Sequence, residues 1–99
     1  MVKIVCTNYA YLDIKDIYDY ISKESKRYAY YQVNKLKNST KILKNYPKTG
    51  RIVPEIDRDD IRELIEGNYR IIYRIKDTDR IDILTIYHSA RTLNIDKLI

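Results

Sequence analysis

Arginine and histidine side chains that could bind an anion and move a proton alternate with apolar residues in the second half of the chain. Arg70 and Arg74 lie in the segment 69–75, and His88, the only histidine, follows the segment 81–87. Because residues i and i+2 share one face of a β-strand, each segment presents its basic residues on one side. In a hairpin with Arg70 opposite His88, their Cβ atoms lie about 4.5–5.5 Å apart. A permanent cation disfavours imidazolium, which leaves the imidazole available as a base.

The same alternation gives both segments an apolar face. The apolar sets are Tyr69, Ile71, Tyr73 and Ile75 in the first segment and Ile81, Ile83, Thr85 and Tyr87 in the second. We expect helices to cover this face and to leave Arg70 and His88 on an open face, as is common in antiparallel sheets. A register slip of two residues, with Arg70 opposite Ile86, satisfies the same faces. As an alternative to a role in chemistry, Arg70 is a solvated strand arginine that pairs with Glu63 or Glu66.

Hydrophobic periodicity predicts the elements that position this hairpin. Alternation over residues 2–6 indicates a strand, and Thr7 or Asn8 can cap a following helix that ends near residues 23–25. A second helix is expected over residues 26–46 and ends at Pro47 and Gly50. Next we expect a loop over 50–60, strands over 61–65, 69–75 and 81–87, and a short helix or coil over 91–98. This order predicts one α+β domain over residues 1–99, with an N-terminal strand, a helical hairpin and a three-stranded antiparallel meander whose two helices share one face.

Charge is unevenly distributed along the chain. The net charge of +5 and a pI near 9.3 favour an anionic partner such as nucleic acid. Residues 1–50 carry +6 and residues 51–99 carry −1, so the basic surface lies mostly on the predicted second helix. Lys37, Lys41 and Lys44 step along one flank of that helix, either as a solvated face or as contacts to phosphate. On the first helix, Asp13 and Asp16 lie off the apolar stripe, where we expect them to face solvent.

Several functional classes are disfavoured by what the sequence lacks. The single Cys6 cannot form an internal disulfide, which suggests a reducing cytoplasm, and we expect it to be a small core residue. The first residues are not typical of a signal peptide, and no run approaches the roughly 20 apolar residues of a membrane helix. One histidine, one cysteine and scattered carboxylates give no usual ligand spacing, and no glycine-rich phosphate loop occurs. We therefore expect no metal and no cofactor.

The sequence from Arg62 onwards also carries a family pattern. Arg62-Glu63-Leu64 precedes GNYRIIYRI, and after a turn the last strand ends in His-Ser-Ala-Arg at residues 88–91. This pattern resembles the RelE/ParE superfamily of toxins from bacterial and archaeal toxin–antitoxin modules. The resemblance covers nearly the whole chain, because the helix DIKDIYDYISKES and residues 47–55 fit it as well. It implies a small antiparallel sheet with two helices on one face, and a cognate antitoxin that is often acidic and disordered.

The resemblance implies one of two main activities. RelE-like and YoeB-like members enter the ribosome and cleave mRNA, which needs a base, an acid and cations that hold the scissile phosphate. On this interpretation, which we favour from the sequence, Arg70 matches the arginine that contacts the scissile phosphate. His88 matches the histidine of YoeB-like members, and Glu55 resembles their base glutamate. The further phosphate contacts are then Arg74, Arg91, Lys37, Lys41 and Lys44.

The alternative is a ParE-like activity. ParE-like members poison DNA gyrase and have no nuclease site, and the His-Ser-Ala-Arg ending is compatible with their sequences. Ser89 stands where YoeB-like members have a tyrosine, and no tyrosine follows Tyr87. A third possibility is an antitoxin binder whose toxic activity has decayed. The expected partners are a cognate antitoxin together with the ribosome and mRNA, or with DNA gyrase instead, and the expected location is the cytoplasm.

Overall fold

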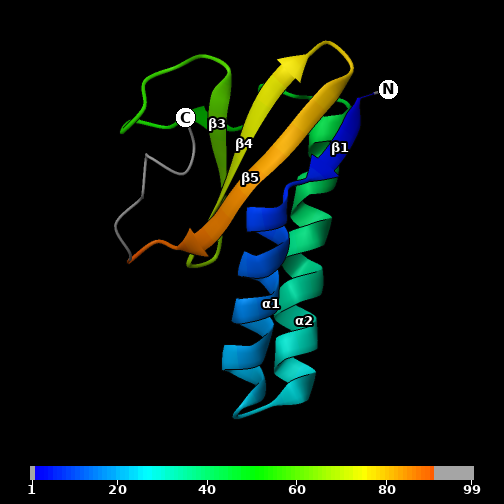
Figure 1. The fold of residues 1–99 in the computed structure, drawn as a ribbon, viewed down its shortest axis with the longest axis vertical. Helices are drawn as coiled ribbons and strands as arrows, with labels where there is room; N and C mark the ends of the chain where they lie inside the picture. The colour runs from blue at the N-terminus through cyan, green and yellow to red at the C-terminus, as the bar shows by residue number, and fades with distance from the viewer. Residues whose placement is uncertain (1, 91–99) are drawn as a thin grey trace.

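The computed structural model describes residues 2–90, which form a mixed five-stranded sheet with two helices packed on one face (Figure 1). The elements are β1 (Lys3–Cys6), α1 (Asn8–Ser22), α2 (Lys26–Ser39), the 3₁₀-helix η1 (Thr40–Lys44), β2 (Arg51–Ile52), β3 (Ile61–Glu66), β4 (Tyr69–Asp77) and β5 (Arg80–His88). The strands lie in the order β1-β5-β4-β3-β2, with β1 parallel to β5 and the other neighbours antiparallel. The predicted α+β fold is confirmed. No helix in residues 2–90 is long and apolar enough to cross a membrane.

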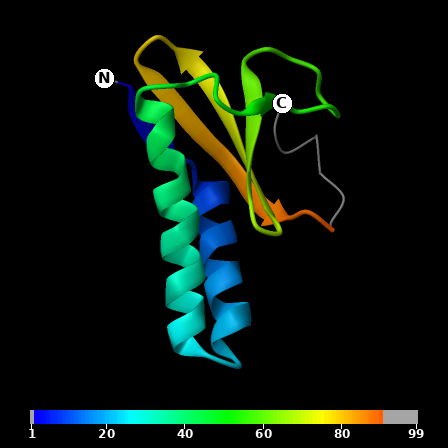
Figure 2. The ribbon, with the colours of Figure 1, turned by 180° about the vertical axis from the view of Figure 1, so that it is seen from behind.

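The two helices run side by side and extend past the end of the sheet, as both ribbon views show (Figure 1, Figure 2). Thr7 caps α1, because its hydroxyl oxygen accepts a hydrogen bond from the backbone N–H of Ala10 at 3.2 Å. The same hydroxyl donates to the carbonyl of Ile83 in β5 at 2.8 Å, which ties the start of α1 to the sheet. Ser25 caps α2 by accepting from the N–H of Tyr28 at 3.1 Å.

The second helix is shorter than the predicted range of residues 26–46. Its α-helical part ends at Ser39, and the chain continues as a 3₁₀-helix to Lys44. The hydroxyls of Ser39 and Thr40 donate to the carbonyls of Leu36 and Lys37, at 2.7 Å and 2.8 Å. Such side-chain bonds compete with the α-helical ladder, which accounts for the tighter winding beyond Ser39.

The register between β4 and β5 differs from the predicted one by a single residue. Arg70 lies opposite Tyr87, whereas His88 lies opposite Tyr69. Because opposed residues of an antiparallel pair point to the same side, Arg70 and His88 point to opposite faces of the sheet. The prediction that Arg70 faces His88 on one open face is therefore wrong.

The pairing of β4 with β5 is interrupted twice, near Lys76 in β4 and at Leu84 in β5, and the second interruption sets the register at Arg70. Ile72 pairs with Thr85, and the next residue of β4, Tyr73, pairs with Ile83. Leu84 is therefore an extra residue in β5, which makes a β-bulge. The alternation of β5 is inverted past the bulge, and both Ile83 and Ile86 reach the core beneath the helices. Asp13 of α1 accepts from the backbone N–H of Ile86 at 3.0 Å, which satisfies this edge of β5. Asp13 is thus half-buried and bound to the sheet, and the prediction that it faces solvent is wrong.

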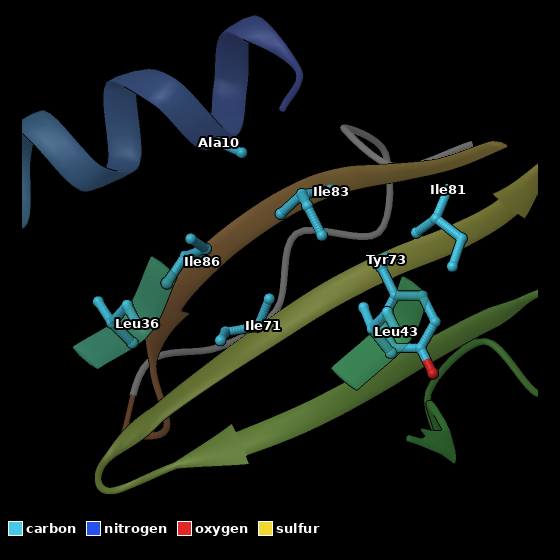
Figure 3. Packing of buried hydrophobic residues seen from close by; sticks show 8 residues of the cluster. All are labelled: Ala10, Leu36, Leu43, Ile71, Tyr73, Ile81, Ile83 and Ile86. Carbon is cyan, nitrogen blue, oxygen red and sulfur yellow. The ribbon is translucent and has the colours of Figure 1, made fainter. Parts of the chain in front are cut away.

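The main core lies between the helical layer and the sheet. Figure 3 shows its buried side chains: Ala10, Leu36 and Leu43 from the helical layer, and Ile71, Tyr73, Ile81, Ile83 and Ile86 from β4 and β5. Removing this apolar surface from water is the main driving force that holds the helices on the sheet. Cys6, which was expected in this core, is exposed on β1.

The face of the sheet away from the helices is covered by residues 53–60, which we call the strap. The helices and the strap lie on either side of the sheet (Figure 1). The strap contributes to a second apolar cluster that comprises Val53, Ile56, Ile61, Ile72, Leu84 and Tyr87. The predicted loop over residues 50–60 therefore contains the short strand β2 and packs on the sheet, so the face that was expected to be open is partly closed.

The hydroxyl group of Tyr73 holds the chain just before the strap. It donates to the carbonyl of Pro47 at 2.7 Å and accepts from the N–H of Gly50 at 3.0 Å. Space is tight at this point, because a Cβ atom on residue 50 would lie 2.5 Å from the carbonyl oxygen of Glu63. Glycine is therefore the residue that lets β2 approach β3 and β4 here.

Replacing Tyr73 with phenylalanine should lower the free energy of unfolding by about 1–3 kcal/mol, because Gly50 and Pro47 lose their buried hydrogen-bond partner. Urea unfolding followed by circular dichroism measures the change. Tyr20→Phe is the matched control, since Tyr20 is 68% exposed, and it should change the same quantity by less than about 0.5 kcal/mol. Equal effects of the two substitutions would show that the Tyr73 hydroxyl does not hold the loop.

Candidate functional site

A buried carboxylate lies at the centre of the sheet face under the strap. The side chain of Glu63 on β3 is 0% exposed, and its two oxygens accept hydrogen bonds from Arg51 and Arg70. Arg51 on β2 is the cross-strand neighbour of Glu63, and Arg70 reaches it from β4 on the other side. A buried charge without partners is strongly destabilising, so the two arginines are what allows an ionised carboxylate at this position.

A second carboxylate, from the strap, binds the end of the Arg70 side chain. Nη1 and Nη2 of Arg70 donate to the two carboxylate oxygens of Glu55 at 2.8 Å and 3.0 Å. This parallel pair of bonds uses the fork geometry that arginine offers to a carboxylate or a phosphate. The side chain of Arg70 is 11% exposed and that of Glu55 is 37% exposed, so the pair lies at the rim of the strap.

Tyr87 completes the surroundings of Arg70. The register puts the two residues opposite each other, and the guanidinium carbon lies 5.2 Å from the centroid of the tyrosine ring. A guanidinium over an aromatic ring makes a favourable cation–π contact, which is stronger away from water. Burial raises the pKa of Tyr87, so the phenol stays neutral beside the cation at ordinary pH. Tyr87 therefore packs on Arg70 as a neutral ring.

The charges of this network balance. Arg51 and Arg70 are the two cations, and Glu55 and Glu63 are the two anions. The hydrogen bonds from Arg70 lower the pKa of Glu55, and the bonds to Glu55 raise the pKa of Arg70. A carboxylate with a lowered pKa is a weak base, and a guanidinium whose fork is already bound does not offer it to a phosphate. The arrangement is suited to holding the strap on the sheet.

His88 lies on the other face of the sheet, beside α1. Its ring meets the ring of Tyr69 edge to face, with 5.5 Å between the centroids. Its Nδ1 atom accepts from the backbone N–H of Ala90 at 3.1 Å. With side chains of α1, His88 lines a cavity of about 260 Å³. The sheet therefore separates this imidazole from Arg70 and Glu55.

The other predicted phosphate contacts are dispersed. Arg74 lies on β4 and pairs with Asp60 of the strap, with 3.3 Å between Nε and Oδ2. Arg91 lies outside the described residues. The exposed basic residues on α2 and η1 include Lys37, Lys41 and Lys44. Of the predicted site residues, the structure thus brings together Arg70 and Glu55 and keeps His88 apart from them.

Two residues that matter here were not identified from the sequence in these roles. Arg51 falls in a two-residue strand, which is too short to show any periodicity. Asp13 lies on the polar side of α1 in the sequence pattern but accepts a hydrogen bond from β5, and nothing in the local sequence indicates that contact. The alternative pairing of Arg70 with Glu63 is confirmed, but Arg70 is 11% exposed and is therefore not the solvated arginine that was expected. Within residues 2–90, no group of three or more His, Cys, Asp or Glu side chains is arranged to hold a metal ion.

Comparisons with known proteins identify the class of protein that has this fold. A family model described as "ParE toxin of type II toxin-antitoxin system, parDE" matches residues 4–93. The solved structure "Chromosomal ParDE TA system from P. aeruginosa" is similar, with a TM-score of 0.73 and 25% sequence identity over 89% of this chain and 96% of that chain. No curated protein matches the chain. The fold is therefore that of the RelE/ParE superfamily of toxins, as the sequence resemblance predicted.

The family match also decides between branches of the superfamily. Because it spans most of the chain, the protein belongs to the ParE toxin family of type II toxin–antitoxin systems. Membership of this family implies a cognate antitoxin as a partner, since the toxin and the antitoxin form one system.

The pairing of Glu55 with Arg70 predicts a specific response of stability to acid. Because the pKa of Glu55 in the folded protein lies below its ordinary value of 4.5, the folded state binds fewer protons than the unfolded state. The contribution of the pair is therefore fully present above pH 4.5 and is lost as the pH falls through the lower folded-state pKa. Glu55→Gln should lower the free energy of unfolding by about 1 kcal/mol at pH 7, and the difference from the wild type should shrink toward pH 3.

Urea unfolding at a series of pH values from 7 to 3 measures this difference. Asp57→Asn is the matched control, because Asp57 lies in the same strap, makes no ion pair within residues 2–90, and has a positive φ of 54° that asparagine also tolerates. A pH-independent difference between Glu55→Gln and the wild type would mean that the Glu55–Arg70 pair does not hold the strap.

Proposed function

We propose that this protein is a type II toxin that inhibits DNA gyrase, and that residues 1–99 form one toxin domain. The match to ParE toxins supports the proposal, because the resemblance implies that ParE-like members poison gyrase and have no nuclease site. The single observation that carries it is that Arg70 forms ion pairs with Glu55 and Glu63, so its guanidinium is not free to bind a phosphate. Action on gyrase implies that the toxin works in the cytoplasm, where gyrase and DNA meet.

Ribosome-dependent cleavage of mRNA is not supported by the geometry of the candidate site. Cleavage needs a base, an acid and a phosphate-binding cation within reach of one scissile bond. Arg70 and His88 point to opposite faces of the sheet, so they do not reach the same phosphodiester. Glu55 is bound to Arg70 and its pKa is lowered, which makes it a poor proton acceptor. The gyrase alternative therefore replaces the nuclease interpretation that the sequence favoured.

Inhibition of gyrase requires binding, and the helical layer is suited to binding a protein. Tyrosine is enriched at protein–protein interfaces because it combines a large apolar ring with a polar tip. Exposed tyrosines are spread over both helices and comprise Tyr9, Tyr11, Tyr20, Tyr28, Tyr30 and Tyr31. We infer that these rings contact the antitoxin or gyrase, whereas the strap face serves the fold.

The proposal predicts opposite results in two assays of the purified toxin. The toxin should block ATP-dependent supercoiling of a relaxed plasmid by gyrase, and it should leave mRNA intact in a reconstituted translation reaction. His88→Gln should block supercoiling as well as the wild type does, because the proposal gives the imidazole no chemical role. Agarose gels report supercoiling, and primer extension reports cleavage of the mRNA.

Addition of the cognate antitoxin in equal amount is the control and should restore supercoiling. The gyrase proposal would be overturned by unimpaired supercoiling together with ribosome-dependent cuts in the mRNA. Loss of those cuts in His88→Gln would then restore the nuclease interpretation.

A further inference from the structure

The cations of this chain are segregated from its anions over a long stretch. Residues 25–54 contain eight lysines and arginines and no aspartate or glutamate, whereas the remaining residues carry a net charge of −3. This stretch includes α2, η1 and β2. In Figure 2 this stretch runs along the second helix of the hairpin and continues through the connection that leads to the strap. The +5 charge of the protein is therefore concentrated on one part of its surface.

Three lysines form a row on this surface, which we call the lysine row: Lys37, Lys41 and Lys44. Residues four apart in an α-helix lie on the same flank, which aligns Lys37 with Lys41 at the junction of α2 and η1. In the 3₁₀-helix η1, residues three apart eclipse, so Lys41 and Lys44 stand one above the other. At 1.5–2.0 Å per residue, the row spans about 10–14 Å. All three side chains are exposed.

The lysine row has no carboxylate partner among the described residues, in contrast to the arginines around the strap. Arg51, Arg62, Arg70 and Arg74 all pair with acidic side chains of β3 or the strap. At the borders of the row, Lys35 pairs with Glu66 and Lys48 pairs with Asp59. Within residues 2–90, the three lysines of the row form no ion pair with any carboxylate. They are available to a partner that supplies negative charge.

We propose that the lysine row binds the phosphate backbone of duplex DNA. A duplex carries one negative charge per about 1.7 Å of axis, so the row spans three to four base pairs of a dense, regular line of charge. Lysine binds phosphate as a point charge and needs no fixed fork, in contrast to the paired arginines. The neighbouring exposed side chains Asn38, Asn45 and Tyr46 are further donors of the kind that bond phosphate oxygens.

Duplex DNA fits this surface better than an acidic peptide does. A peptide that docks with useful affinity needs several buried apolar anchors. Within the described residues beside Lys41 and Lys44, the exposed side chains include only one aliphatic residue, Ile42, among the polar residues Asn38 and Asn45. Binding to a nucleic-acid backbone gains its affinity from the release of counterions and needs no such anchor. The inference goes beyond the action on gyrase, because it concerns the toxin and DNA alone and is tested with no gyrase present.

The test is fluorescence anisotropy of a labelled 20-base-pair duplex of arbitrary sequence, titrated with the toxin of residues 1–99 in 50 mM salt. The triple variant Lys37→Gln, Lys41→Gln, Lys44→Gln should bind at least tenfold more weakly than the wild type. The matched control changes three exposed lysines outside the row, Lys3→Gln, Lys23→Gln and Lys76→Gln, and so removes the same charge. It should bind within about threefold of the wild type.

The salt dependence of DNA binding is a second measurement. It separates lost phosphate contacts from a general loss of net charge. Each lost phosphate contact lowers the slope of log K against log salt by about 0.9, so the triple variant should lose nearly three units of slope. The single variant Lys41→Gln should lose about one unit, which keeps the test decisive if the triple variant folds poorly.

Three results would overturn the proposal: no binding of the duplex by the wild type, equal losses in the triple variant and its control, or an unchanged slope. Binding to a 20-residue polyglutamate peptide is measured in parallel. If the triple variant keeps its affinity for DNA and loses its affinity for that peptide, the row binds an acidic protein segment and not DNA.

Discussion

The burial of the Glu63 carboxylate is the constraint on which the strap side of the molecule depends. A carboxylate without access to water is tolerated only where cations and hydrogen bonds replace the lost hydration, and Arg51 and Arg70 supply both. Two arginines on one carboxylate leave an excess positive charge, which Glu55 balances from the strap. The apolar cluster around Val53 and Ile72 packs the strap on the same face of the sheet. One network thus joins β2, β3, β4 and the strap.

The β-bulge of β5 divides the remaining chemistry of the chain between the two faces of the sheet. If the pairing of Tyr73 with Ile83 continued without the extra residue Leu84, His88 would point to the same face as Arg70. With the bulge, Tyr87 packs on Arg70 and His88 lies beside α1. A one-residue change of register therefore keeps His88 away from Arg70, which pairs with the carboxylates under the strap. The surfaces left for partners are the tyrosines and unpaired lysines of the helical layer.

Local patterns in the sequence predicted the fold well and the site poorly, and the reasons differ. Alternation over β4 and β5 and the three-and-four spacing in the helices are strong because each periodicity repeats over many residues. The bulge depends on how Ile83 and Ile86 both meet the helices, which is a tertiary contact that no local pattern encodes. Residues 50–60 were expected to form a loop, and the sequence did not show that the carboxylates of the strap dock it on Arg70 and Arg74. The pairing of Arg70 with Glu63 was foreseen as an alternative, because both residues alternate on adjacent strands.

Whether Arg70 serves the fold by pairing with Glu63 is measured by a double-mutant cycle. The free energies of unfolding are determined for the wild type, Arg70→Met, Glu63→Gln and the double variant. Because the two groups are in contact in a buried network, Arg70→Met should be clearly destabilising and the coupling energy should be about 1–3 kcal/mol. A coupling energy near zero, with Arg70→Met as stable as the wild type, would instead identify Arg70 as a free surface cation.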